Sequence, residues 1–166
     1  MSKSDSIRKK IFTGTNTEFS NLLSVFAFQG KKIVFTNGCF DLIHQGHVDY
    51  LAKASDLGDV LIIGLNTDAS VQRIKGKNRP VQDEYSRALI LASFSFVDAV
   101  VYFNDDNPYE LIKTIQPDVL VKGSDYKAED IVGYDIVKAK GGEIITMDYL
   151  PGFSTTALIE KIKAEK

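Results

Sequence analysis

Cysteine is nearly absent from this sequence of 166 residues: Cys39 is the only one, and tryptophan does not occur at all. A single cysteine excludes an intrachain disulfide and a zinc site built from cysteines, and it favours the reducing cytoplasm. Long apolar runs are missing too, since runs such as VLIIGL at 60–65 fall far short of the about 20 residues that span a membrane. The opening segment, MSKSDSIRKK, lacks the apolar centre of a signal peptide. These absences predict a cytoplasmic protein with no membrane partner.

An excess of charge of one sign is also absent. The formal net charge is −2, with 25% charged and 44% hydrophobic residues. Proteins that bind nucleic acids usually carry a basic excess or a basic stripe, so we expect no nucleic-acid partner. The mild acidity is still compatible with a small anionic substrate in a locally basic cleft. The length favours one domain with a substantial core.

Short runs rich in β-branched residues alternate with helical patterns. The expected strands, each buried on both faces, are 32–36, 60–66, 99–103, 119–123 and 143–149. The expected helices between and after them are 47–58, 83–94, 108–115 and 154–162. This alternation predicts a single doubly wound α/β domain, with a five-stranded parallel sheet and helices on both faces.

Residues 1–30 are predicted to form an N-terminal arm with a short amphipathic helix at 16–28, and the main domain is predicted at 31–166. The apolar face of this helix needs a cover, because exposed apolar surface is unfavourable in water. That face comprises Phe19, Leu22, Leu23 and Phe26. We expect it to pack either on its own domain or on a partner subunit.

Both histidines of the sequence, His44 and His47, follow the first strand within the segment NGCFDLIHQGH at 37–47. Ligands of open parallel sheets bind at the carboxyl ends of the strands, near the reversal in strand order. Gly38 permits a tight turn there, and the free N–H groups of a helix N-terminus attract phosphate. One histidine at a helix start is more often a cap or a surface residue, and zinc lacks a full ligand set here. Two imidazoles three residues apart face the same way and add N–H donors, which favours a phosphate site.

The other strand ends carry groups suited to anions. These are the four cations of RIKGKNRP at 73–80, Lys122 and Gly123 at the end of the fourth strand, and the hydroxyls of 154–156 after Gly152. Each has an ordinary alternative: a solvated loop, a simple turn and a helix N-cap, respectively. Because the strand ends meet at one edge of the sheet, together they predict a polyphosphate pocket. Neither GxxxxGK[ST] nor GxGxxG occurs, so the pocket belongs to neither of those nucleotide-binding types.

A family resemblance is carried by two of these segments. GCFDLIHQGH at 38–47 matches the GxFDxxHxGH signature of the cytidylyltransferase-like nucleotidyltransferases, and GFSTT at 152–156 resembles their second motif. The resemblance extends from about Lys31 to Ile162. Within the family, the segments TNGCFD, NTDASV, KGKNRPV, PDVLVKGSDY and GGEI are similar to the adenylyltransferases that make ADP-heptose. Many of these are fused to a sugar kinase, which this sequence does not contain, so the stand-alone form is expected.

The resemblance implies a Rossmann-like fold for a nucleotidyltransferase domain at 31–166. It implies an enzyme that transfers AMP from ATP to D-glycero-D-manno-heptose 1-phosphate and releases pyrophosphate, on the route to lipopolysaccharide or another heptose-containing glycan. The implied partners are ATP and a sugar phosphate, and the implied cofactor is Mg²⁺, which accompanies ATP. The resemblance also favours a homo-oligomer, with a dimer as the expected state.

By motif position and by placement at strand ends, the predicted catalytic residues are His44, His47, Lys75 and Lys122. The predicted nucleotide-binding residues are Thr36, Asn37, Gly38, Cys39, Phe40, Asn66, Arg79, Gly123, Asp125, Ser154 and Thr155, together with the two histidines. No residue is predicted as a metal ligand, and Asp41 is expected either to lie in the outer shell of Mg²⁺ or to fix the turn. Because a helix N-terminus disfavours an imidazolium, both histidines are expected to be neutral in the free protein.

Two other functions stay open. Cytidylyltransferases for alcohol phosphates such as glycerol 3-phosphate read RTEGISTT where this sequence reads YLPGFSTT at 149–156, and the missing arginine argues against them. Asn107 in DDNP also departs from the DTP that is usual in the heptose enzymes. A module that binds ATP without turning it over is the alternative outside catalysis. The paired histidines favour the enzyme, since glycine loops and lysine suffice for phosphate binding alone.

Overall fold

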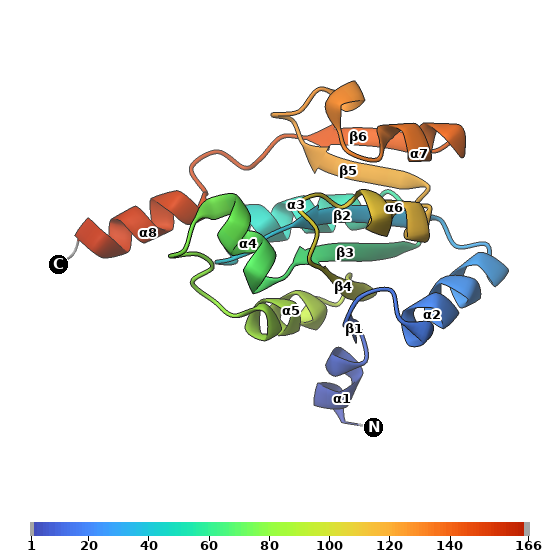
Figure 1. Cartoon of the computed structure of the whole chain (residues 1–166), viewed down its shortest axis with the longest axis horizontal. Coiled ribbons are helices and arrows are strands. Elements are labelled where there is room, and N and C mark those ends of the chain that lie inside the picture. The colour runs from blue at the N-terminus through green and yellow to red at the C-terminus, as the bar shows by residue number, and fades with distance from the viewer. Residues whose placement is uncertain (1, 165–166) are drawn as a thin grey trace.

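The computed structural model describes residues 2–164 and contains one parallel sheet with the strand order β1-β4-β3-β2-β5-β6 (Figure 1). Its strands are β1 (Ile11–Phe12), β2 (Ile33–Gly38), β3 (Val60–Asn66), β4 (Ala99–Phe103), β5 (Val119–Gly123) and β6 (Glu143–Met147). The prediction of an α/β domain with a parallel sheet is confirmed, but the predicted number of five strands is wrong. The additional strand, β1, has only two residues, and it pairs with Val100 and Val101 of β4. A run of two residues has no periodicity from which a strand could be predicted.

The helices are α1 (Lys3–Arg8), α2 (Thr17–Phe28), α3 (Gln45–Ser55), α4 (Asp68–Lys75), α5 (Glu84–Ser93), α6 (Tyr109–Ile115), α7 (Tyr134–Ala139) and α8 (Thr155–Ala164), with a 3₁₀ turn, η1, at Ala128–Asp130. The helices predicted around 16–28, 47–58, 83–94, 108–115 and 154–162 are all present. Side-chain caps begin several of them, because a helix start leaves N–H groups without partners. Asn16 accepts a hydrogen bond from the N–H of Phe19 (2.9 Å), and Asp83 accepts one from Ser86 (2.9 Å).

Alternate residues of each central strand belong to cores on opposite faces of the sheet, as expected for strands that are buried on both sides. In β2, Ile33 and Phe35 pack with α2, α6 and α7, whereas Val34 packs with α3 and α5. The two clusters make the layered helix–sheet–helix architecture of a doubly wound domain.

The amphipathic helix α2 packs on its own domain. Phe19 is fully buried in the core on one face of the sheet, and Leu22, Leu23 and Phe26 pack against the same cluster. Of the two covers expected for the apolar face of α2, its own domain or a partner subunit, the structure shows the first.

Figure 1 also shows that α8 projects beyond the sheet, and none of its residues is buried.

The strand order reverses at β2. The chain runs from β2 to β3 and β4 on one side, and it returns to place β5 and β6 on the other. Pairing between β2 and β5 is confined to Val34–Val119 and Phe35–Leu120, although β2 continues to Gly38. The carboxyl ends of these two strands are therefore not joined, and this is where open α/β sheets bind ligands.

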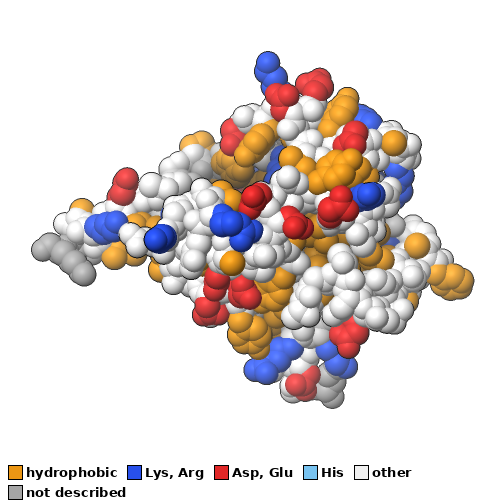
Figure 2. All heavy atoms as spheres, viewed as in Figure 1, with side chains coloured by type: hydrophobic (Ala, Val, Ile, Leu, Met, Phe, Trp, Pro, Cys, Tyr) orange, Lys and Arg blue, Asp and Glu red, His pale blue; other side chains and the backbone are white. Residues whose placement is uncertain are grey.

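None of the helices within residues 2–164 is long and apolar enough to cross a membrane. Figure 2 shows acidic and basic side chains interspersed over the face drawn, rather than a basic stripe.

Candidate active site

A cavity of about 330 Å³ lies at the carboxyl edge of the sheet, between the ends of β2 and β5. Eleven of the predicted site residues line it: Asn37, Gly38, Cys39, Phe40, His47, Asn66, Lys75, Arg79, Lys122, Asp125 and Thr155. They come from the ends of three strands, from α3 and α4, and from the start of α8. The structure thus brings residues that are more than a hundred positions apart in the sequence into one pocket.

The two histidines stack on each other at the start of α3. Their ring centroids are 3.9 Å apart, with an interplanar angle of 27°. The backbone N–H of His44 donates to Nδ1 of His47 (3.4 Å), which makes Nδ1 an acceptor. A neutral imidazole that accepts at one nitrogen carries its proton on the other, so the Nε2–H of His47 is left as a donor.

Both imidazoles favour the neutral form. Burial, with smaller contributions from His44 and Lys75, lowers the pKa of His47 to about 4. Burial also lowers the pKa of His44 below its usual value. These directions agree with the neutral histidines expected for a helix N-terminus, because desolvation disfavours the charged form.

The turn from Gly38 to Phe40 is held in a specific shape. Phe40 has φ of 45°, a left-handed conformation that L-residues seldom adopt. A Cβ at Gly38 would approach the Phe40 ring to 3.0 Å, so a larger residue there would require the ring to shift. The carbonyl oxygen of Cys39 accepts a 2.6 Å hydrogen bond from Nη1 of Arg87, which is fully buried. Burial raises the pKa of the Cys39 thiol, which keeps it protonated.

Asp41 also lines the cavity, but its carboxylate oxygens are used to fix the segment before α5. Its side chain is almost entirely buried and accepts hydrogen bonds from Nε of Arg79 (2.6 Å) and the N–H groups of Val81 (2.8 Å) and Gln82 (3.0 Å). Burial alone would raise the pKa of this carboxyl, but the hydrogen bonds from Gln82, Arg79 and Val81 lower it below its usual value. Of the two roles expected for Asp41, the geometry favours the structural one.

The four cations of 73–80 have different surroundings. Arg73 lies in α4 and pairs with Asp106 (2.8 Å), and Nε of Arg79 is bound to Asp41. Lys75, at the end of α4, lines the cavity and joins none of the ion pairs between residues 2–164. A solvated loop was the ordinary alternative for this segment, but its first three residues belong to α4, which Thr67 caps at Ser70 (3.2 Å) and which ends at Gly76 with φ of 96°.

Lys122 is the cation at the end of β5, and it lines the cavity. It too is outside the ion pairs formed within the described part of the chain. Burial lowers its pKa to about 8, although Asp125 and Cys39 act in the opposite direction. A largely buried ammonium without a carboxylate partner is unfavourable, and an anionic ligand would supply the missing charge.

Four predicted residues lie outside the cavity lining. Thr36 is fully buried, and its hydroxyl is 2.9 Å from the Tyr50 hydroxyl, so its side chain does not reach the cavity. Gly123 is covered by Tyr149, whose ring and hydroxyl occupy the space that an added Cβ would need. Ser154 accepts from the N–H of Ala157 (3.0 Å) and caps α8, the alternative weighed for it. His44 lies behind His47 and stacks on Phe153 at 6.4 Å.

Four lining residues were not predicted: Tyr50, Ile74, Tyr126 and Tyr149. Tyr126 and Tyr149 follow strand ends, which is the signal that could have indicated them. Tyr50 and Ile74 lie inside helices α3 and α4, and nothing in their spacing separates a cavity wall from a core position.

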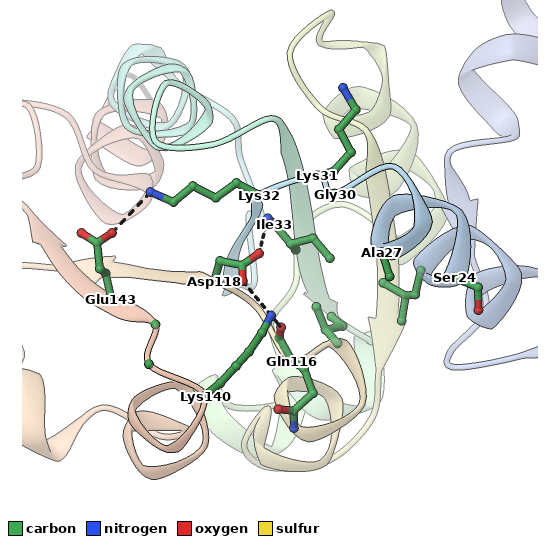
Figure 3. A pocket seen from close by; sticks show the side chains of 14 residues that line it. Ser24, Ala27, Gly30, Lys31, Lys32, Ile33, Gln116, Asp118, Lys140 and Glu143 are labelled. Carbon is green, nitrogen blue, oxygen red and sulfur yellow. Dashed lines mark hydrogen bonds and ion pairs between the residues drawn. The ribbon is translucent and has the colours of Figure 1, made fainter.

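A larger cavity, of about 720 Å³, lies at the opposite edge of the sheet (Figure 3). Four of its five charged side chains are paired: Lys140 lies 2.7 Å from Asp118, and Lys32 lies 3.3 Å from Glu143, which leaves Lys31 outside these pairs. Asp118 also accepts from the N–H of Ile33 (2.8 Å), so its carboxylate has partners for both oxygens. The smaller cavity, where Lys75 and Lys122 form no ion pair within residues 2–164 and the only paired carboxylate is Asp41, is therefore the better candidate for binding an anion.

Comparison with known proteins gives consistent relatives. The sequence profile described as Cytidylyltransferase-like matches residues 35–161. The bifunctional protein HldE of a Nitratiruptor species is 55% identical over 136 residues, which are 82% of this chain and 29% of that protein. HldE of Campylobacter jejuni (strain RM1221) is 52% identical over 164 residues, which are 99% of this chain and 34% of that protein. The chain thus spans about a third of the length of these relatives.

Two solved structures are similar to the fold. The lipopolysaccharide core biosynthesis protein of Thermoplasma volcanium GSS1 is 28% identical, with a TM-score of 0.62 over 73% of this chain and 99% of that one. Pantoate-beta-alanine ligase of Francisella tularensis is 18% identical, with a TM-score of 0.60 over 92% of this chain and 76% of that one, a likeness of fold alone. The resemblance found in the sequence and the Rossmann-like fold it implies are confirmed. This chain belongs to the cytidylyltransferase-like family of nucleotidyltransferases.

Proposed function

We propose that the chain is an adenylyltransferase that transfers AMP from ATP to a heptose 1-phosphate and releases pyrophosphate. The observation that carries the proposal is the cavity at the reversal of strand order, where the neutral donor His47 lies with Lys75 and Lys122, two cations that form no ion pair within residues 2–164. The similarity to HldE proteins supports the choice of this reaction within the family. The choice of heptose rests on the segments, such as KGKNRPV and PDVLVKGSDY, that resemble the enzymes making ADP-heptose.

The proposed reaction requires neutralisation of charge more than removal of a proton. A phosphate monoester has a second pKa near 6, so the attacking oxygen is already ionised at neutral pH. Two anions must then approach each other, and charge moves onto the leaving oxygens. Fixed donors and cations serve this need through positioning and electrostatic stabilisation. In this account the Nε2–H of His47 donates to the α/β-phosphate region, and Lys75 and Lys122 neutralise the phosphates.

The donor set fits Mg²⁺ that arrives with the nucleotide. No group of three or more His, Cys, Asp or Glu side chains suited to a metal ion occurs among residues 2–164. Mg²⁺ usually keeps several waters and binds through substrate phosphates and one or two carboxylates. Asp125 lines the cavity and is the carboxylate available for such a contact, since Asp41 is occupied by Arg79. Bound there, the ion would supply positive charge that offsets the charge of the phosphates.

The proposed reaction consumes ATP, and it is proposed to take place in the cytoplasm and to supply a precursor of lipopolysaccharide or another heptose glycan.

A homodimer remains the proposed assembly. Leu158 and Ile162 support it, because 37% and 62% of their surfaces are exposed on α8, a helix in which no residue is fully buried. Light scattering coupled to gel filtration tests the dimer, and a monomer mass over the whole working concentration range would contradict it.

Pyrophosphate release tests the proposed function. ATP and CTP are each combined, with Mg²⁺, with D-glycero-D-manno-heptose 1-phosphate and with glycerol 3-phosphate. Turnover with ATP and the heptose phosphate alone is the expected result. Turnover with CTP and glycerol 3-phosphate would keep the chemistry and overturn the substrates. No turnover in any combination, with ATP still bound, would indicate a nucleotide-binding module instead.

A further inference from the structure

The cavity of about 330 Å³ at the carboxyl edge of the sheet is the candidate nucleotide pocket. At the same edge a second cavity, of about 240 Å³, adjoins it. The two cavities share a wall made of Asn37, Asn66, Ile74, Lys122 and Tyr126. Beyond this wall, the second cavity is bounded by the segment that leads into α6, at 106–108, and by the end of η1 with the two residues after it, at 130–132. A reaction between two substrates requires two adjoining sites of this kind, with the reacting atoms at the shared boundary.

The two cavities differ in charge. The first is lined by His47, Lys75, Arg79 and Lys122, whereas Lys122 is the only cation among the residues lining the second. The far side of the second cavity carries the carboxylate of Asp130, the amide of Asn107 and the carboxylate of Asp106, which is paired with Arg73. Carboxylates repel a triphosphate, and carboxylates and amides readily hydrogen-bond hydroxyl groups. The second cavity therefore suits a polyhydroxylated group with its phosphate at the Lys122 end.

The shared wall contains two polar groups that lack partners. The side-chain Oδ1 of Asn37 is buried and has no hydrogen-bond donor within the described chain. The ammonium of Lys122, on the same wall, joins no ion pair among residues 2–164. A buried polar atom left unsatisfied costs about 1–3 kcal/mol, which applies to Asn37 Oδ1. An anion would neutralise the neighbouring ammonium of Lys122, so the two groups in one wall indicate a ligand there.

We propose that this second cavity is the acceptor subsite, in which a sugar phosphate lies with its phosphate against Lys122 and its hydroxyls toward Asn107 and Asp130. The inference rests on the proposed adenylyl transfer and names the residues that select its acceptor. An oxygen of the acceptor phosphate forms a bond to the α-phosphorus of ATP as the bond from that phosphorus to the bridging oxygen breaks. The electron pair leaves on pyrophosphate, and no proton needs to move.

Asn107 has one group free for this role. Its Oδ1 accepts from the N–H of Tyr109 (3.0 Å) at the start of α6, so its amide NH₂ is left to donate. The position therefore combines a structural contact with a donor in the acceptor wall. The sequence departs from the heptose enzymes at this residue, and its place in the second cavity assigns that departure to acceptor choice rather than to nucleotide choice.

The test compares Asp130→Asn with Glu129→Gln. Each change removes one exposed carboxylate from neighbouring positions, but only Asp130 lines the cavity. We expect Asp130→Asn to raise the KM for D-glycero-D-manno-heptose 1-phosphate about tenfold, the change that loss of one strong hydrogen bond produces. The KM for ATP and the melting temperature should stay at their wild-type values, and Glu129→Gln should behave as the wild type throughout.

Asn107→Asp is the second variant, because it keeps the oxygen that caps α6 and removes the amide donor. It should raise the KM for the heptose phosphate while leaving that for ATP unchanged. An acceptor KM within about twofold of wild type in both variants overturns the subsite, since that is less than one hydrogen bond contributes. A raised KM for ATP instead would mean that the nucleoside occupies this cavity, which also overturns it. A wild type that releases no pyrophosphate with any sugar phosphate refutes the proposed function, and the subsite then falls with it.

Discussion

The buried guanidinium of Arg87 donates a 2.6 Å hydrogen bond to the carbonyl oxygen of Cys39, in the turn that faces the candidate nucleotide pocket. The same side chain donates to Oδ1 of Asp68 (2.7 Å) and to the carbonyl of Gln82 (3.1 Å). One residue of α5 thus joins the turn after β2, the start of α4 and the segment that Asp41 anchors. These contacts fix the relative positions of three segments of the site, and Arg87 itself is fully buried.

Replacement of Arg87 by methionine should destabilise the fold strongly. The change removes three hydrogen bonds and leaves Asp68 and two carbonyl oxygens without their donor. Breaking a buried ion pair lowers the free energy of unfolding by about 3 kcal/mol or more. Urea denaturation of the wild type and the variant measures this difference.

Arg73→Met is the matched control, because Arg73 pairs with Asp106 on the surface, where the two side chains are 44% and 74% exposed. An exposed pair of this kind contributes less than about 1 kcal/mol, so this variant should lose little stability. Equal losses in the two variants would contradict the role assigned to Arg87.

His47→Ala should lower turnover far more than it weakens ATP binding. The Nε2–H of His47 is expected to donate to charge that grows only in the transition state, and such donors act on kcat. Loss of one such donor reduces kcat roughly a hundredfold to a thousandfold. His47→Gln retains an N–H donor in the same region and should keep more of the activity. Steady-state kinetics and calorimetry with ATP separate the two effects, and unchanged turnover in His47→Ala would remove this residue from the mechanism.

The pKa of about 4 for His47 predicts that acid weakens the fold. The unfolded chain binds a proton at this histidine near pH 6.5, whereas the folded protein does not until about pH 4. The unfolded state therefore binds more protons between these values, and the free energy of unfolding falls as the pH falls through this window. After allowance for partial exposure, the loss between pH 7 and pH 5 should be about 1–2 kcal/mol.

Two measurements check this pH dependence. NMR titration resolves the only two imidazoles of the chain directly, and a pKa above the ordinary value for His47 in the free protein would contradict the prediction. Denaturation at pH 5 and pH 7 should show a smaller difference in His47→Gln than in the wild type. Bound ATP should raise the pKa of His47, because nearby phosphates favour the imidazolium.

The sequence was sufficient to predict the elements whose pattern is local. The strands at 60–66, 99–103 and 119–123 agree with β3, β4 and β5 in their bounds, since β-branched runs indicate strands wherever they pack. Strand β1 was missed because its pairing depends on a distant partner: the N–H of Val100 donates to the carbonyl of Lys10 (2.8 Å). The helix α4 was not predicted, because its residues are mostly polar and its buried positions are only Ser70 and Val71.

The location of the site was predictable for a related reason. Parallel strands end at one edge of the sheet, so residues that follow strands are brought together whatever the rest of the chain does. Which of those residues face the cavity was not predictable. Thr36 is withdrawn by Tyr50, and Gly123 is covered by Tyr149, and both contacts join elements far apart in the sequence. Side-chain contacts of this kind leave no periodic pattern in a single sequence.

The buried charge of Lys122 should lower the stability of the free protein, and the same charge should be required for turnover. Its ammonium is largely buried beside the shared wall of two cavities, and it takes part in no ion pair formed within residues 2–164. Methionine has a similar shape and no charge to desolvate, so Lys122→Met should raise the free energy of unfolding by about 1 kcal/mol or more. The same variant should lose most of its turnover, because nothing then neutralises the phosphates at that wall.

The pKa of about 8 gives a second readout for Lys122. The pH dependence of kcat/KM reports the ionisation of groups in the free enzyme. In the wild type kcat/KM should fall as the pH rises through about 8 and the Lys122 ammonium loses its proton. This fall should be absent from the residual activity of Lys122→Met. The folded-state pKa lies below the ordinary value of 10.5, so the unfavourable charge is present at low pH and is relieved as the pH rises between the two values. Wild-type stability relative to Lys122→Met should therefore increase from pH 8 to pH 10. A variant that is less stable than the wild type at pH 7 would show that Lys122 has a structural partner, and it would refute the role assigned to this residue.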